Sequence, residues 1–234
     1  MHRPRRHPEM DVPSMTAVCE EAHARGVLVA AHAQSVEGVR NALLAGVDTI
    51  EHGSSMDEET IALYKDNPKS LRGWSAMIPT LQACMPLVKL DQSVTSANDV
   101  VHANAVLVLD EMVAGIAAAR ENDIPIGMGT DSAVTYVTHA NTWLELEYLV
   151  RFGGFTIAEA VNTATAGNAR ILGIDDVTGS LEVGKSADVI LLDRNPMDAL
   201  SALRQPRAVI AHGHLIENPV IDRITEIDDQ LASI

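Results

Sequence analysis

The sequence predicts an α/β fold built on a parallel sheet, and three observations support this prediction. Apolar residues alternate between the spacing of helices and the spacing of strands, which is typical of βαβ units. Four strand-like segments are each followed by a connection that could return to the next strand; four such strands are half of an eight-stranded barrel. Finally, His32, His52 and Asp131 each follow one of these segments, and parallel α/β folds place their chemistry at such strand ends.

The first two strands are predicted at 27–32 and 47–52, each after an amphipathic helix. The first helix is indicated by an apolar stripe that Gly26 stops, formed by Met15, Val18, Cys19 and Ala22. Ser35 can cap the second helix, and Gly46 can end it. These signals place two βα transitions within the first third of the chain.

The next two strands are predicted at 73–80 and 124–130. Asp57 can cap the helix before the third strand, with Ile61 and Tyr64 facing inward. A polar stretch at 91–99 leads into a long helix at roughly 98–121, and the fourth strand follows it. Asp131 comes directly after this strand.

Beyond Asp131 the pattern predicts helices and then a separate, strand-rich region. A helix at about 141–152 is broken by two glycines, a capping box at 156–159 opens the next helix, and a further short helix ends at Gly173. After residue 175, short β-like runs contain Leu181, Val183, Val189, Ile190, Leu191, Leu192, Val209, Ile210, Leu215 and Ile216. The expected organisation is therefore a barrel-like part over 9–174, a strand-rich part over 175–217, and tails at 1–8 and 218–234.

Composition narrows the classes of function. Apolar residues make up 47% of the 234 residues, so a sizeable core can be buried. The net charge of −15 argues against nucleic acid and against an anionic membrane surface, both of which would repel it. Two cysteines cannot support a disulfide framework, and no secretory signal or spanning apolar run is present. We expect a cytoplasmic protein that acts on small molecules.

The three strand-end residues indicate a divalent metal, most simply zinc. Two imidazoles and a carboxylate at neighbouring strand ends can share one ion. A second His-x-His arrangement, His212-Gly213-His214, has a spacing that could also bind metal, but it lies in the strand-rich region. We expect those two histidines to form a solvent-exposed turn instead.

Several motifs resemble the metal-dependent amidohydrolase superfamily. Three segments resemble the ends of its strands five, six and eight, in that order: Ala31-His32-Ala33, Ile50-Glu51-His52-Gly53 and Gly129-Thr130-Asp131. Residues 178–189 resemble its Gly-x-Leu-x-x-Gly-x-x-Ala-Asp signature, and 139–146 are similar to the loop after strand eight in the branch of imidazolonepropionase and Xaa-Pro dipeptidase-like enzymes. The resemblance covers about residues 9–217.

The resemblance implies the C-terminal half of a (β/α)8 barrel, strands five to eight, with the C-terminal portion of a small β-sandwich at 175–217. It implies that His32, His52 and Asp131 bind one or two metal ions. Asp131 would also exchange protons with the attacking water, and His139 would contact the carbonyl or carboxylate of the substrate. The implied activity is hydrolysis of a C–N bond in an amide, dipeptide or cyclic amide, with esters as related substrates.

The sequence departs from the family pattern in one large respect. The family's His-x-His of strand one and the metal-bridging lysine of strand four have no counterpart in the chain. Two alternatives to a self-sufficient enzyme therefore stand beside it: a non-catalytic fragment, or one part of an assembly. In the assembly, a second copy or the missing N-terminal half would cover the open sheet edges.

Overall fold

The computed structural model describes residues 9–234, and the predicted tail at 1–8 lies outside the described residues. The chain forms two compact units, Met1–Pro79 with Leu107–Gly127 and Thr80–Val106 with Met128–Ile234. The boundary expected near residue 174 lies within the second unit, and it stays a prediction.

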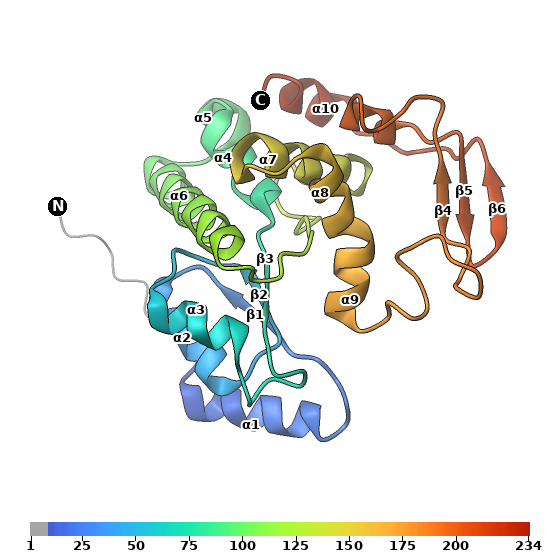
Figure 1. The fold of residues 1–234 in the computed structure, drawn as a ribbon. Coiled ribbons are helices and arrows are strands. Elements are labelled where there is room, and N and C mark those ends of the chain that lie inside the picture. Colours follow the sequence, from blue (N-terminus) through green and yellow to red (C-terminus); the bar gives the residue numbers. More distant parts are fainter. Residues whose placement is uncertain (1–8) are drawn as a thin grey trace. The chain divides into compact units, whose positions relative to one another are not determined.

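The first unit holds a parallel three-stranded sheet in the order β1-β2-β3 (Figure 1). The strands are β1 (Ala30–Ala33), β2 (Thr49–His52) and β3 (Ala76–Ile78). Helix α1 (Val12–His23) precedes them, α2 (Val36–Ala45) joins β1 to β2, and α3 (Glu58–Lys65) lies between β2 and β3; α1 packs on α2 and α2 on α3. The predicted parallel arrangement is confirmed for these three strands, each shorter than expected.

The helix boundaries follow from the capping residues that the sequence offers. Ser35 accepts the Gly38 N–H at 3.1 Å and Asp57 accepts the Thr60 N–H at 2.9 Å, so both predicted N-caps are confirmed. Gly46 ends α2 with a φ of 105°, a conformation in which a side chain is strained. The sheet and helices enclose a core that includes Val39, Leu43, Ile50, Tyr64 and Met77, all of which are fully buried.

The fourth predicted strand, 124–130, does not form as a strand, and this prediction was wrong. Only Ile126 bridges to Met77, supported by a bond from the Met77 N–H to the Pro125 oxygen at 3.0 Å and one from the Gly127 N–H to the Met77 oxygen at 2.9 Å. Pro125 has no N–H to donate, and glycines weaken strands. The segment therefore follows β3 for one bridge only.

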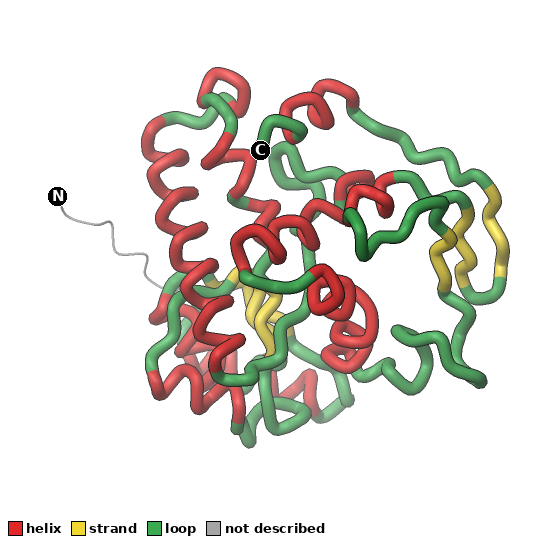
Figure 2. Tube along the Cα trace, turned by 45° about the horizontal axis from the view of Figure 1, so that its top comes forward, coloured by secondary structure: helices red, strands yellow, loops and turns green. Residues whose placement is uncertain are grey.

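The second unit is mainly helical and contains an antiparallel sheet that precedes its last helix (Figure 2). Its main helices are α4 (Met85–Lys89), α5 (Gln92–Thr95), α7 (Trp143–Gly153), α8 (Ile157–Asn162), α9 (Asn168–Leu172) and α10 (Thr225–Leu231). Short 3₁₀ helices complete it, η1 (Leu81–Ala83), η2 (His139–Asn141) and η4 (Leu200–Arg204), together with the π-helix η3 (Thr163–Gly167). The capping box of Thr156 and Glu159 at the start of α8 is confirmed.

The antiparallel sheet has the order β4-β5-β6, with β4 (Val189–Leu191), β5 (Ala208–Ala211) and β6 (His214–Glu217). This confirms a strand-rich region after residue 175, although Leu181 and Val183 lie outside its strands, beside turns. His212 and Gly213, with φ of 49° and 79°, form the two-residue turn between β5 and β6, as hairpins of this length require. Both histidines of the His-x-His are exposed, as predicted, but only His212 lies in the turn, because His214 begins β6 and pairs with Ala211.

Helix α6 (Asp99–Glu121) is long and apolar enough to cross a membrane, with a mean hydropathy of 1.6 over the scanned window. By length and composition alone this is weak evidence, because core helices share these properties. Its apolar face packs into the protein, where Val108, Met112, Ile116 and Ala119 are buried. One third of the scanned window is buried in this way, whereas Val100, Val101 and Leu107 of the same helix are exposed.

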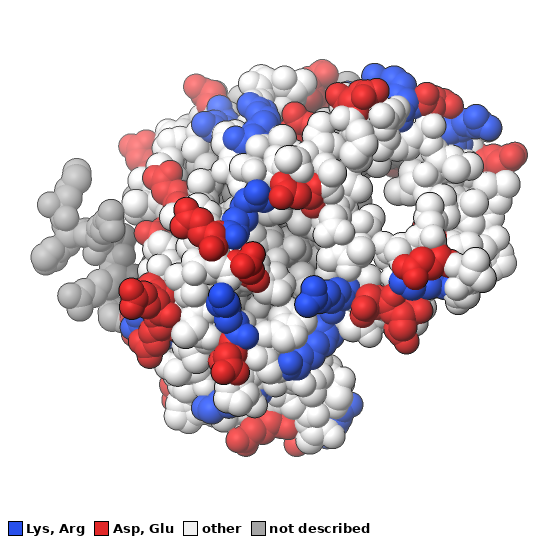
Figure 3. All heavy atoms as spheres, viewed as in Figure 1, with Lys and Arg blue, Asp and Glu red and all other residues white. Residues whose placement is uncertain are grey.

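Acidic and basic side chains are interspersed on the face drawn in Figure 3. The chain as a whole carries 32 acidic and 17 basic residues. Acidic residues thus exceed basic ones by 15 in the whole chain, whereas this face carries both signs side by side.

Candidate active site

Two of the predicted site residues, His32 and His52, come together at adjacent strands of the first unit. His32 lies in β1 and His52 ends β2, where the register pairs Ala33 with His52. His52 Nε2 lies 2.8 Å from His32 Nδ1, and the two rings meet edge to face with centroids 4.6 Å apart. The predicted convergence of these two imidazoles is therefore observed.

The two histidines differ in their exposure. The His52 residue is only 4% exposed, whereas His32 is exposed and lines a pocket of about 590 Å³ together with Met10, Met15 and Gln34. The ring of His32 is thus accessible from this pocket, and the buried ring of His52 contacts it.

The backbone at His52 adopts an unusual conformation. Its φ is 70°, and the next residue, Gly53, has a φ of 79°. A non-glycine residue in this region costs on the order of 1–3 kcal/mol, and such residues are concentrated at functional sites. Thr80 after β3 and Asp131 after the Ile126 bridge share this conformation, with φ of 52° and 55°. Left-handed residues thus follow successive strand ends of the predicted barrel.

The loop after His52 is held in place by helix α6. Ser55 donates its backbone N–H and its hydroxyl to Glu111 Oε2, at 3.2 and 2.5 Å. Glu111 was not predicted as a supporting residue; the signal that could have found it is a carboxylate within a strongly apolar helix. Its role here is to fix the loop that carries the strained turn after His52.

Gly115 of α6 allows the closest approach of this helix to the same loop. A Cβ at Gly115 would lie 2.4 Å from the Ser54 oxygen and 3.0 Å from Met77 Cε. We therefore expect Gly115→Ala to lower the free energy of unfolding by about 1–3 kcal/mol, because backbone atoms must move to relieve the overlap. Urea unfolding would measure this. A gain of about 1 kcal/mol, the usual result of replacing a helical glycine by alanine, would contradict the close contact.

Asp131 and His139 lie in the second unit, both exposed. Asp131 begins a tight loop in which its carbonyl accepts the Val134 N–H at 3.3 Å, and His139 opens the turn η2. Among residues 9–234, no three His, Cys, Asp or Glu side chains are grouped so that they could hold a metal ion. The histidine pair is the assembled part of the predicted ligand set, and the roles of Asp131 and His139 stay predictions.

The histidine pair fits part of a metal site. Neutral imidazole nitrogens are ordinary ligands of zinc and similar ions, and these two nitrogens already face one another. A structural or catalytic zinc takes three or four protein ligands, so the pair supplies two positions. The remaining ligands would have to come from other groups.

A buried carboxyl that sequence reasoning missed lies in the second unit. Glu145 of α7 is 0% exposed, and it accepts the backbone N–H groups of Leu81 and Gln82 at 2.7 and 2.8 Å. Burial raises the pKa of this carboxyl to about 8, although the two N–H donors act in the opposite direction. Glu145 therefore fixes the start of η1, directly after the left-handed Thr80.

This raised pKa makes the stability of the fold depend on pH. The pKa of Glu145 in the unfolded chain is near 4.5 and in the folded chain about 8, so between these values the folded state holds more protons. The free energy of unfolding should then fall as pH rises from about 5 to 8, by at most ~1.4 kcal/mol per pH unit from this group. Urea unfolding at several pH values measures this slope.

Glu145→Gln should flatten that slope, although the variant is expected to be less stable at low pH because one N–H loses its acceptor. Glu147→Gln, two residues along the same helix, is the matched control and should keep the slope. An identical pH dependence in wild type and Glu145→Gln would contradict the assignment.

Comparison with known proteins adds to this geometry. The sequence profile of the amidohydrolase family matches residues 3–216. The ochratoxinase of Aspergillus niger is 30% identical over 198 residues, which are 83% of this chain and 38% of that protein. The chain thus spans well under two thirds of the length of this curated relative.

Two solved structures are similar to most of the chain. The structure of a Bifidobacterium longum protein assigned as a prolidase is 53% identical, with a TM-score of 0.93, and the match covers 95% of this chain and 55% of that one. A Xaa-Pro dipeptidase with bound methionine in its active site is 31% identical, with a TM-score of 0.76, and the match covers 90% and 50%. The match to about half of each barrel enzyme agrees with a partial barrel.

Proposed function

The chain belongs to the amidohydrolase family, and from this premise we propose that it is a metal-dependent hydrolase that cleaves the C–N bond of Xaa-Pro dipeptides or related amides. The relatives described above are hydrolases acting on C–N bonds, and they give no support to a non-catalytic fragment. The observation that carries the proposal is the His32–His52 pair, which lies at adjacent parallel strands with His52 buried in a strained conformation.

The amidohydrolase family generally uses divalent metals, and we propose zinc for this chain. His32 and His52 would hold the ion through their ring nitrogens, which must be neutral to do so, so activity should fall at acid pH. When bound, a zinc ion polarises a substrate carbonyl and lowers the pKa of a water toward ~7. The buried position of His52 keeps its ring fixed, as a ligand requires.

The proton transfers are assigned to Asp131. In this proposal its carboxylate takes a proton from the attacking water and delivers it to the leaving nitrogen, the general acid–base role. Because Asp131 is exposed and lies in a turn with a left-handed backbone, its carboxylate can reach a substrate without movement of buried side chains. His139, exposed at the start of η2, would contact the carbonyl or carboxylate of the substrate and orient it.

A substrate panel tests this function. The purified chain, supplied with zinc, would be assayed for proline release from Xaa-Pro dipeptides, with N-acyl amino acids and cyclic amides in parallel. Turnover of the Xaa-Pro series that depends on zinc supports the proposal and its substrate class. Turnover of only the other amides would retain the hydrolase and reject the dipeptide assignment, and no turnover of any compound would contradict the activity of this chain.

A further inference from the structure

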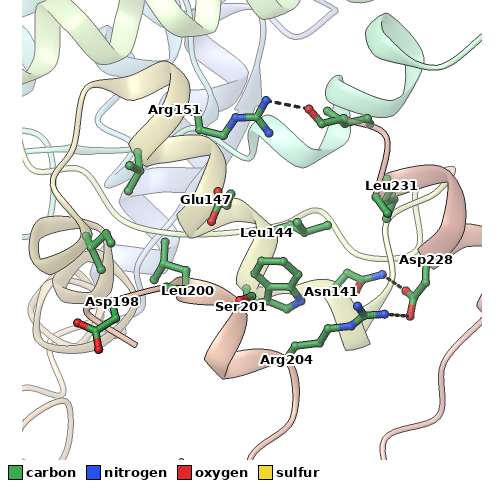
Figure 4. A pocket seen from close by; sticks show the side chains of 16 residues that line it. Asn141, Leu144, Glu147, Arg151, Asp198, Leu200, Ser201, Arg204, Asp228 and Leu231 are labelled. Carbon is green, nitrogen blue, oxygen red and sulfur yellow. Dashed lines mark hydrogen bonds and ion pairs between the residues drawn. The ribbon is translucent and has the colours of Figure 1, made fainter. Parts of the chain in front are cut away.

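The strongest unexplained feature of the second unit is a buried network of charged and amide groups around Asp228 of α10 (Figure 4). Its carboxylate accepts one bond from Asn141 Nδ2 at 2.7 Å through Oδ1. Through Oδ2 it accepts a bond from Arg204 at 3.0 Å and one from Arg223 at 3.2 Å. The Asp228 side chain is 8% exposed, and Asn141 is 3% exposed. A buried carboxylate with two guanidinium partners is costly to disrupt.

The network connects three segments that are far apart in the sequence. Asn141 closes the turn η2 that begins at His139, Arg204 ends η4, and Asp228 lies in α10. Both ends of the Asn141 amide are used, because Oδ1 also accepts a bond from Arg223 at 3.3 Å. The turn is closed by the bond from the Asn141 N–H to the Thr138 oxygen at 3.1 Å. Fixing Asn141 therefore fixes the turn that carries His139.

Open space lies beside the hydrogen-bonded network. A pocket of about 440 Å³ is lined by Asn141, Leu144, Leu200, Arg204, Asp228 and Leu231, so the network borders open space (Figure 4). Burial raises the pKa of Asp228, but the bonds from Asn141, Arg204 and Arg223 offset this and hold the pKa below its usual value. The carboxylate is thus charged under ordinary conditions, and its hydrogen bonds carry the contact between α10 and the turn.

We propose that Asp228 is a positioning residue which, through Asn141, fixes the turn that presents His139 to the substrate. The proposal rests on the proposed function for the role of His139. It assigns to α10, outside the matched part of the family, a function in binding substrate. Loss of the network should let the turn move and so weaken substrate binding more than turnover.

Two measurements on the purified chain test this, one of which does not need activity. Asp228→Asn keeps the shape of the side chain but places an amide N–H against the guanidinium groups. We expect it to raise KM for a Xaa-Pro dipeptide about tenfold with little change in kcat, and to lower hydrogen-exchange protection of the 141 and 142 amides about tenfold. Asp229→Asn, an exposed neighbour on the same helix, is the matched control and should change neither.

A swapped pair separates positioning from general damage to the fold. Asn141→Asp alone would set two carboxylates against each other, whereas Asn141→Asp combined with Asp228→Asn restores one amide and one carboxylate. The double variant should recover most of the protection, and most of the KM where activity is measurable. Unchanged exchange in Asp228→Asn, or no recovery in the double variant, would overturn the proposal. Should the wild type show no hydrolysis, the proposed function fails, while exchange still decides whether Asp228 positions the turn.

Discussion

Replacing His52 by asparagine is expected to lower kcat/KM for Xaa-Pro hydrolysis by more than about 100-fold, because even residues that only support metal ligands cost 10- to 100-fold. Asparagine is chosen because it tolerates the left-handed conformation that His52 adopts, with a φ of 70°. The variant thus removes the imidazole and leaves the backbone unstrained. Steady-state kinetics with added zinc would measure the loss, with circular dichroism to confirm folding.

His214 provides the matched control for this experiment. It is an exposed histidine of the β5–β6 hairpin, so His214→Ala removes an imidazole that lies outside the proposed site. We expect kinetics indistinguishable from wild type. A folded His52→Asn variant with wild-type kcat/KM would show that the buried imidazole is not part of the catalytic site.

Asp131→Asn is expected to lower kcat by a factor of about 100 to 10,000, the usual contribution of a general acid–base group. The amide matches the carboxylate in shape and also tolerates a φ of 55°, so the change removes the charge and the proton acceptor without altering the backbone. The measurement is kcat at saturating substrate and zinc, with bound zinc determined on the same sample because Asp131 is also a predicted ligand.

Asp123 is a close control for Asp131. It is exposed, it has the same side chain, and its φ of 57° places it in the same conformation. Asp123→Asn should therefore leave kcat within about twofold of wild type, as surface substitutions usually do. Equal rates for Asp131→Asn and wild type would remove Asp131 from the mechanism.

Local chemistry made much of the fold predictable. The N-caps at Ser35 and Asp57 and the capping box of Thr156 and Glu159 are short-range signals, and each marks a helix start in the structure. The strand predicted at 124–130 does not form, because Pro125 has no N–H to donate to a ladder. The prediction relied on the apolar pattern of this segment and gave Pro125 too little weight. The start of β1 was predicted too early, because the apolar run Val27-Leu28-Val29 precedes the paired residues.

The site was predictable only in part, because its geometry depends on distant residues. The pairing of His32 with His52 follows from strands that are adjacent in sequence and in the sheet. By contrast, Glu145 binds N–H groups 63 and 64 residues away, and no spacing rule reveals such a partner. A glutamate between Leu144 and Leu146 was the available signal. The left-handed φ of His52 likewise has no mark in the sequence beyond the glycine that follows it.

The most direct test of the metal site is the amount of zinc bound per chain, measured by elemental analysis after dialysis against a zinc buffer. Wild type, His32→Ala and His214→Ala would be compared under identical conditions. We expect about one ion per chain in wild type and in His214→Ala, and a loss of that ion in His32→Ala. No zinc in wild type, or equal zinc in wild type and His32→Ala, would contradict the claim that the His32–His52 pair forms a metal site.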